Sequence, residues 1–184
     1  MKENGRYRLE DDYHCIDIVL TSILQLFDGR DPSPFKERDL EEDFSRYLIL
    51  AIREIGVQEK VKLVIKMQEH HPSFLKAKDV EEAIYTYYSF ELENSRNDLR
   101  VLFKQGRSTL AMGLAFLAAC YTGYYFTKDQ ATLFWGFLGE GLHVMGWVAM
   151  WKPINLFLYE WWPIKDRMAL MSSLQHLKVE IVTG

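Results

Sequence analysis

Cysteine and net charge are both scarce in this sequence, and each shortage excludes a class of protein. The two cysteines, Cys15 and Cys120, are too few for a disulfide framework. The formal net charge of −4 and the isoelectric point near 5.8 give no basic excess for a phosphate backbone, so we expect no nucleic-acid partner. Residues 1–14 lack the apolar stretch of a secretory signal, so we expect membrane insertion to depend on later segments.

Motifs of known chemistry are missing as well. The sequence has no Gly-rich phosphate loop, no Cys-x-x-Cys pair and no spacing typical of a Ser-His-Asp site. We therefore expect no cofactor, and an enzyme is the less favoured class. Glu69, His70 and His71 are candidate metal ligands, but three adjacent residues in a strand-to-loop segment rarely point at one centre. We expect no metal there.

Two long apolar runs dominate the second half of the chain. Residues 108–127 carry no formal charge, and twenty residues are the length of helix that crosses a hydrocarbon core about 30 Å thick. Residues 131–151 form a second run, in which Glu140 and His143 are the ionisable groups. The connection between the runs is so short that it predicts an antiparallel transmembrane hairpin. The alternative is a pair of buried helices in a soluble protein.

Charge and tryptophan predict how this hairpin is placed. Basic residues flank the outer ends of both runs, so the positive-inside rule puts both termini in the cytoplasm. Segment 151–167 has an apolar side and is predicted to contain an interfacial amphipathic helix that Pro153 can start and Pro163 can end. Four of the five tryptophans lie at its start, its end or just before it, which is typical of a membrane interface. These predicted anchors are Trp147, Trp151, Trp161 and Trp162.

The N-terminal part is predicted to be a small α/β unit. Alternating apolar residues predict strands over 14–23 and 61–67. Between them, Asp39 and Glu42 form a predicted N-cap for a helix that extends to Ile55. Strand, helix and strand in this order imply a right-handed parallel βαβ crossover.

The rest of the chain connects this unit to the membrane. A cap at Asp79 predicts a helix that can continue into the first apolar run as one rod, and 177–182 alternates like a strand that returns to the sheet. The fold class is therefore an α+β membrane protein in three parts. They are a cytoplasmic domain over 1–107, a transmembrane hairpin over 108–151, and an interfacial helix with a cytoplasmic strand over 152–184.

Two blocks of sequence resemble a known family. They are DPSPFKERDL, at 31–40, and GWVAMWKPINLFLYEWWPI, at 146–164. Both resemble blocks in a family of small, uncharacterised bacterial two-pass inner-membrane proteins, and the resemblance covers most of the chain. It implies a bacterial origin and an inner-membrane topology. It implies no activity.

Glu140 and His143 are the main candidate functional residues. They stand three residues apart on one helical face, and burying ionisable groups in a membrane is costly. Three roles remain open: hydrogen bonds that fix helix packing, which is favoured, a proton or ion path, or a metal centre with the Glu-x-x-His spacing. Small residues nearby predict close helix packing within the hairpin or between protomers. These are Ala111, Ala115, Gly136, Gly139 and Gly146.

The loop 28–39 is the second candidate site. It holds four acidic and three basic side chains, and α/β proteins often place sites in such loops. Asp31, Arg38 and Asp39 are the candidate residues, although a proline-stiffened connection is the favoured interpretation. Three function classes follow: a membrane-anchored structural or assembly protein forming a homo-oligomer, a subunit of an oligomeric channel or transporter, and a membrane-bound enzyme. The expected partners are lipid, further copies of the chain and other membrane proteins.

Overall fold

The computed structural model describes residues 6–67, 76–129 and 132–183. The chain divides into two compact units. Unit 1 is Met1–Ser95 with Asp166–Gly184, and unit 2 is Arg96–Lys165. The fold is α+β, and one long helix belongs to both units.

Unit 1 is built on a mixed sheet of four strands in the order β1-β2-β3-β4. β1 pairs antiparallel with β2, while β2, β3 and β4 run parallel. The predicted strand over 61–67 has the bounds of β3, and its parallel pairing with β2 confirms the βαβ crossover. The predicted strand at 177–182 is also confirmed by β4. The strands are β1 (Arg8–Glu10), β2 (Tyr13–Leu20), β3 (Val61–Met67) and β4 (Lys178–Thr183).

Two local features of the sheet differ from expectation. β2 ends at Leu20 because Ser22 starts a short helix, η1 (Ile23–Leu26), in which Ser22 and Gln25 form a capping box. β1 was not predicted. The turn that brings it back to β2 places Asp11 and Asp12 at positive φ, a conformation that short polar side chains tolerate.

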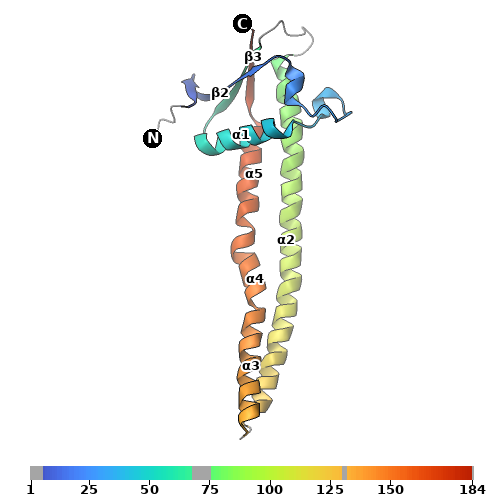
Figure 1. The fold of residues 1–184 in the computed structure, drawn as a ribbon, viewed down its shortest axis with the longest axis vertical. Helices are drawn as coiled ribbons and strands as arrows, with labels where there is room; N and C mark the ends of the chain where they lie inside the picture. Colours follow the sequence, from blue (N-terminus) through green and yellow to red (C-terminus); the bar gives the residue numbers. More distant parts are fainter. Residues whose placement is uncertain (1–5, 68–75, 130–131, 184) are drawn as a thin grey trace. The chain divides into compact units, whose positions relative to one another are not determined.

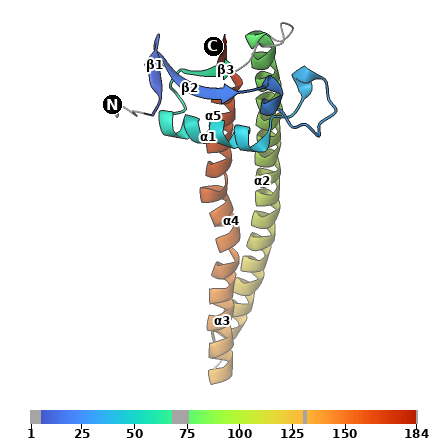
Figure 2. The ribbon, with the colours of Figure 1, turned by 45° about the horizontal axis from the view of Figure 1, so that its top comes forward.

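Helix α1 (Glu42–Ile55) follows the loop that contains η2 (Phe35–Glu37). The predicted cap at Asp39 is wrong: Glu41 is the N-cap residue, and its Oε2 accepts a hydrogen bond from Phe44 N at 2.8 Å. Figures 1 and 2 show α1 lying across one face of the sheet.

Helix α2 (Ala77–Thr127) is a single helix of 51 residues, which confirms the predicted continuous rod. Its first part packs in unit 1, where Ile84 and Tyr88 are fully buried. Helix α5 (Trp162–Gln175) adds Leu174 to the same core. Apolar side chains at helical spacing thus meet Leu63 and Ile65 from the sheet.

Unit 2 contains the later part of α2 and three further helices that return alongside it (Figure 1). The helix α3 (Leu133–Ala149) is followed by α4 (Trp151–Asn155), the π-helical η3 (Leu156–Glu160) and the start of α5. The returning chain runs antiparallel to α2, because Gly139 lies against Thr127 and Gly106 lies against Leu156.

The prediction that Pro163 ends the helix after the second apolar run is wrong. Pro163 does not end a helix but lies in the first turn of α5, where a missing backbone N–H costs little. Segment 151–160 packs alongside α2, because the Phe157 ring lies 6.3 Å from the Phe103 ring of that helix. The position of this segment at a membrane interface stays a prediction.

Among the helices in the described ranges, α2 alone is long and apolar enough to cross a membrane by length and composition. Only 11% of its most apolar window is buried. Helix α3 has 17 residues, fewer than the roughly 20 that span a hydrocarbon core. The predicted hairpin of two membrane-crossing helices is therefore not confirmed.

Candidate functional site

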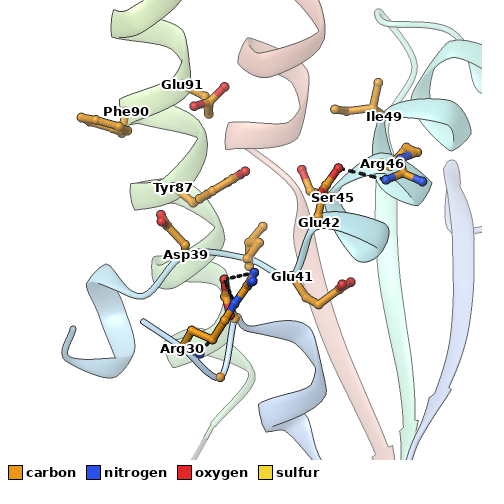
Figure 3. Close-up of a pocket in the computed structure, with 13 residues that line it drawn as sticks. Arg30, Asp39, Glu41, Glu42, Ser45, Arg46, Ile49, Tyr87, Phe90 and Glu91 are labelled. Carbon is orange, nitrogen blue, oxygen red and sulfur yellow. Dashed lines mark hydrogen bonds and ion pairs between the residues drawn. The ribbon is translucent and has the colours of Figure 1, made fainter. Parts of the chain in front are cut away.

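A hollow in unit 1 lies beside the loop 28–41 (Figure 3). Its volume is about 570 Å³. The loop, the first turns of α1 and the segment 87–91 of α2 form its walls, so residues distant in sequence meet there. The polar lining residues are Asp28, Arg30, Asp39, Glu41, Glu42, Ser45, Arg46, Tyr87 and Glu91, and Phe90 stands at the rim.

Both arginines of the hollow are already neutralised by carboxylates. Arg30 donates to both Asp28 oxygens, at 2.8 Å from Nη2 and 3.0 Å from Nε. This guanidinium lowers the pKa of Asp28 to about 2. Arg46 pairs with Glu42 at 3.0 Å and with Asp43 at 3.1 Å. The remaining carboxylates therefore give the hollow a negative potential.

Asp39 is the carboxylate of the hollow that is best placed to meet a ligand. Its side chain is exposed, and within the described ranges no hydrogen bond or ion pair reaches its carboxylate. Partial desolvation raises the pKa of Asp39, and the carboxylates of Asp31, Asp28 and Glu91 raise it further. Glu91 itself binds Arg167 at 2.6 Å. The hollow is thus suited to a cationic group.

Catalysis and metal binding find less support in this hollow. A general base needs a reacting partner in reach, and the hollow brings Asp39 near hydroxyls and carboxylates rather than near a histidine or cysteine. No group of three metal-ligating side chains occurs in the described part of the chain. Glu69, His70 and His71, where the sequence favoured no metal, lie outside the described residues.

Asp31 and Arg38, the other predicted loop candidates, have different surroundings. Asp31 holds the loop closed, because its carboxylate accepts from Ser33 N at 2.9 Å and from Asp39 N at 2.7 Å. These hydrogen bonds lower the pKa of Asp31. Arg38 is half-buried, and its Nε makes no hydrogen bond to the described residues. The contacts of Asp31 support a structural role for this residue.

A smaller hollow of about 230 Å³ shares Ser45 and Tyr87 with the first. Beneath it, the fully buried Tyr88 hydroxyl lies 3.1 Å from Ser45 Oγ. Burial raises the pKa of Tyr88, so this hydroxyl stays neutral and satisfied in the core. Tyr88 therefore has a structural role.

Glu140 and His143 lie in α3, in unit 2. Glu140 is exposed, and within the described ranges it makes no hydrogen bond or ion pair. His143 is half-buried, with its ring 5.3 Å from that of Tyr124 in α2. It also lines an apolar groove of about 380 Å³. The functional roles predicted for the pair remain predictions.

The predicted packing residues separate into two groups. Gly139 and Gly146 are buried against α2, and a Cβ at Gly146 would lie 2.9 Å from Leu117 Cδ1. A Cβ at Gly136 would meet nothing within 4 Å, and Ala111 and Ala115 are exposed. Packing of these three residues between protomers stays a prediction.

The register of this helix contact was not predicted from the sequence. The buried small residues repeat every seven positions, so each helix presents one seam to the other. A search for a seven-residue repeat of small residues would have found it, because each seam is visible in the sequence. The seams are Gly106, Gly113, Cys120 and Thr127 in α2, and Gly139, Gly146 and Pro153 in the returning chain.

The four predicted interface anchors are aromatic side chains at the surface of unit 2. Trp147, Trp151 and Trp162 are 62%, 74% and 58% exposed. Trp161 is half-buried and donates from Nε1 to the Phe157 carbonyl at 2.9 Å. Lys165 lies over its ring at 4.8 Å from the centroid.

Comparisons with protein-family models, with curated proteins and with solved structures found no match to this chain. The resemblance to bacterial inner-membrane proteins is neither supported nor opposed by this result and stays a prediction.

Proposed function

We propose that the chain is a membrane-anchored structural or assembly protein of the bacterial inner membrane, with the apolar part of unit 2 in the lipid and both termini in the cytoplasm. The observation that carries this proposal is the exposure of large apolar side chains in unit 2. Leu133 is 92% and Phe137 81% exposed. Each Å² of such surface costs about 25 cal/mol in water, and lipid removes that cost.

The remaining features of unit 2 support the same environment. Residues 108–127 hold no formal charge, and α3 contributes a second apolar helix that returns beside them. Small residues at the contact between the helices are typical of membrane packing, where lipid tails offer no hydrophobic drive for helix association. Basic side chains of α2 precede the apolar part, which supports a cytoplasmic position for both termini.

A role in assembly fits unit 1 better than a reaction does. The hollow beside Asp39 has carboxylates and an exposed Phe90, which suit a basic segment of a partner protein. An oligomeric channel or transporter subunit is the second candidate, because Glu140 is exposed in an otherwise apolar helix. A rise in ion flux through vesicles containing the purified protein, lost in Glu140→Gln, would favour that second candidate.

Two matched substitutions test the membrane location. Val144 in α3 and Val19 in β2 are 56% and 58% exposed. The proposal places Val144 in lipid and Val19 in water, so the two positions differ mainly in their solvent. Arginine in the middle of a membrane helix costs about 2.5–3.5 kcal/mol on insertion scales. We expect Val144→Arg to reduce the fraction that resists alkaline extraction from membranes, and Val19→Arg to leave it unchanged.

The topology is tested with reporters. One reporter inserted at Asp129 and another fused after Gly184 should lie on opposite sides of the membrane. Extraction of the unmodified chain with the soluble fraction would contradict the membrane location. Two reporters on the same side would contradict the hairpin alone.

A further inference from the structure

An open groove runs along one side of unit 2. Leu114, Ala118 and Tyr121 of α2 form one wall, and His143 and Trp147 of α3 form the other. Its volume of about 380 Å³ is that of several side chains. The groove therefore has room for part of another helix.

The free carboxylate of Glu140 lies on the same side as the groove. Glu140, His143 and Trp147 are spaced three and four residues apart, so they share one face of α3. Within the described ranges nothing pairs with Glu140, whose side chain is exposed. A carboxyl group facing lipid requires a hydrogen-bond partner, since hydrocarbon offers none.

The other wall of the groove permits close approach. Ala118 lines the groove, and Ala111 and Ala115 continue the same face of α2 at helical spacing. All three are exposed. A neighbouring helix backbone can come close to such a surface, whereas larger side chains would hold it away.

We propose that the groove is occupied by a second copy of this chain, with Glu140 of each copy accepting a hydrogen bond from His143 of the other. This contact rests on the proposed membrane location. Copies inserted in the same orientation are related by a two-fold axis along the membrane normal, so equal residues lie at equal depth. Glu140 of one copy and His143 of the other then differ in depth by three residues of helix, or about 4.5 Å, and their side chains are long enough to bridge this distance.

Polar complementarity selects a second copy over lipid. An acyl chain fills an apolar groove but donates no hydrogen bond to Glu140. The same surface on a second copy supplies the imidazole donor and the carboxylate acceptor together. It also covers Tyr121 and Trp147, which otherwise face outward.

Disulfide cross-linking in native membranes tests the position of the contact. The background is the full-length chain with both native cysteines replaced, by Cys15→Ala and Cys120→Ala, and single cysteines are placed at Ala118, in the groove, and at Met145. Met145 is 55% exposed but lies about 140° around α3 from Glu140, at 100° per residue. With copper phenanthroline as oxidant, Ala118→Cys should give a disulfide-linked dimer and Met145→Cys should remain monomeric. Equal or stronger cross-linking at Met145 would overturn the groove as the interface.

The polar pair is tested by the dimer dissociation constant in mild detergent. Glu140→Leu and His143→Phe should each weaken the dimer by roughly 9- to 900-fold, because each removes both symmetry-related contacts and one polar contact between membrane helices contributes about 3- to 30-fold. The double variant should be no weaker than the more affected single variant, because both substitutions remove the same two contacts. Additive losses, or no loss, would overturn the Glu140–His143 pairing.

Fractionation of the same samples separates this inference from the proposed function. A chain that stays in the membrane pellet but has a monomeric mass overturns the contact between copies and leaves the membrane location standing. A chain found in the soluble fraction overturns the membrane location instead.

Discussion

The two units use the same kinds of residue in opposite ways. In unit 1 the large apolar side chains, such as Leu63 and Ile65, are fully buried, and charged side chains lie outside. In unit 2 large apolar side chains such as Phe137 are exposed, while glycines such as Gly146 are buried. A core that excludes water needs large side chains, whereas helices surrounded by lipid are held by close backbone contact. The two units thus have different packing schemes.

The largest expected effect compares one apolar truncation in each unit. Leu63→Ala should leave a cavity in unit 1 and lower its free energy of unfolding by about 2–5 kcal/mol. Phe137→Ala, at a side chain that is 81% exposed, should change the stability in detergent far less. Hydrogen exchange of the full-length protein in detergent measures both. Equal losses would show that Phe137 is packed rather than solvated by detergent or lipid.

A smaller effect is expected from adding volume to the helix contact. Gly146→Val should separate α3 from α2, because a Cβ there would lie 2.9 Å from Leu117 Cδ1 and 3.2 Å from Cys120 Cβ. Overpacking of this kind costs about 1–3 kcal/mol. The matched control is Gly141→Val, at a position with nothing within 4 Å of a Cβ. Thermal unfolding in detergent should distinguish them, and equal midpoints would refute the close contact.

The smallest expected effect is a pH dependence confined to unit 1. The Tyr7 hydroxyl donates to Glu54 Oε2 at 2.8 Å, and burial with this hydrogen bond raises the pKa of Tyr7 from 10.0 to about 12. The folded state therefore holds its proton more tightly than the unfolded state. The raised pKa of Tyr7 therefore stabilises the folded state fully below pH 10, and this stabilisation is lost as the pH rises toward 12.

At pH 11 this loss corresponds to about 1 kcal/mol, given about 1.4 kcal/mol per pKa unit. Denaturant unfolding of unit 1 between pH 9 and 11 measures it. Tyr7→Phe should remove this part of the alkaline dependence. An unchanged slope in Tyr7→Phe would show that another group is responsible.

Local patterns in the sequence were sufficient for several elements. The alternation of residues 61–67 predicted β3 with its observed bounds, since a strand with one buried face needs that period. The absence of Pro and Gly between Asp79 and Gly106 predicted the continuous helix α2. The cap at Asp39 was misplaced, because the loop, in which Asp39 N donates to Asp31, continues to Glu41 before the helix begins, and the sequence does not reveal this path.

The candidate sites were less predictable than the elements. Asp39 was named from the sequence, but Tyr87 and Glu91 were not, because only the packing of α2 in unit 1 brings them to the same hollow. Similarly, the sequence grouped Ala111 and Ala115 with Gly139 and Gly146, but only the two glycines are buried within the pair of helices. A helix with small residues on several faces does not reveal which of them meets a neighbour.

The sequence by itself determined where strands and helices form and that residues 108–127 are apolar enough to cross a membrane, because periodicity, capping and hydrophobic length are properties of neighbouring residues. The tertiary structure alone decided that β1 joins the sheet beside β2, that Gly106 and Gly113 face the returning helices, and that Glu140 stays exposed. These outcomes depend on which surfaces far apart in the chain fit together, and that fit is set by shape and contact distance.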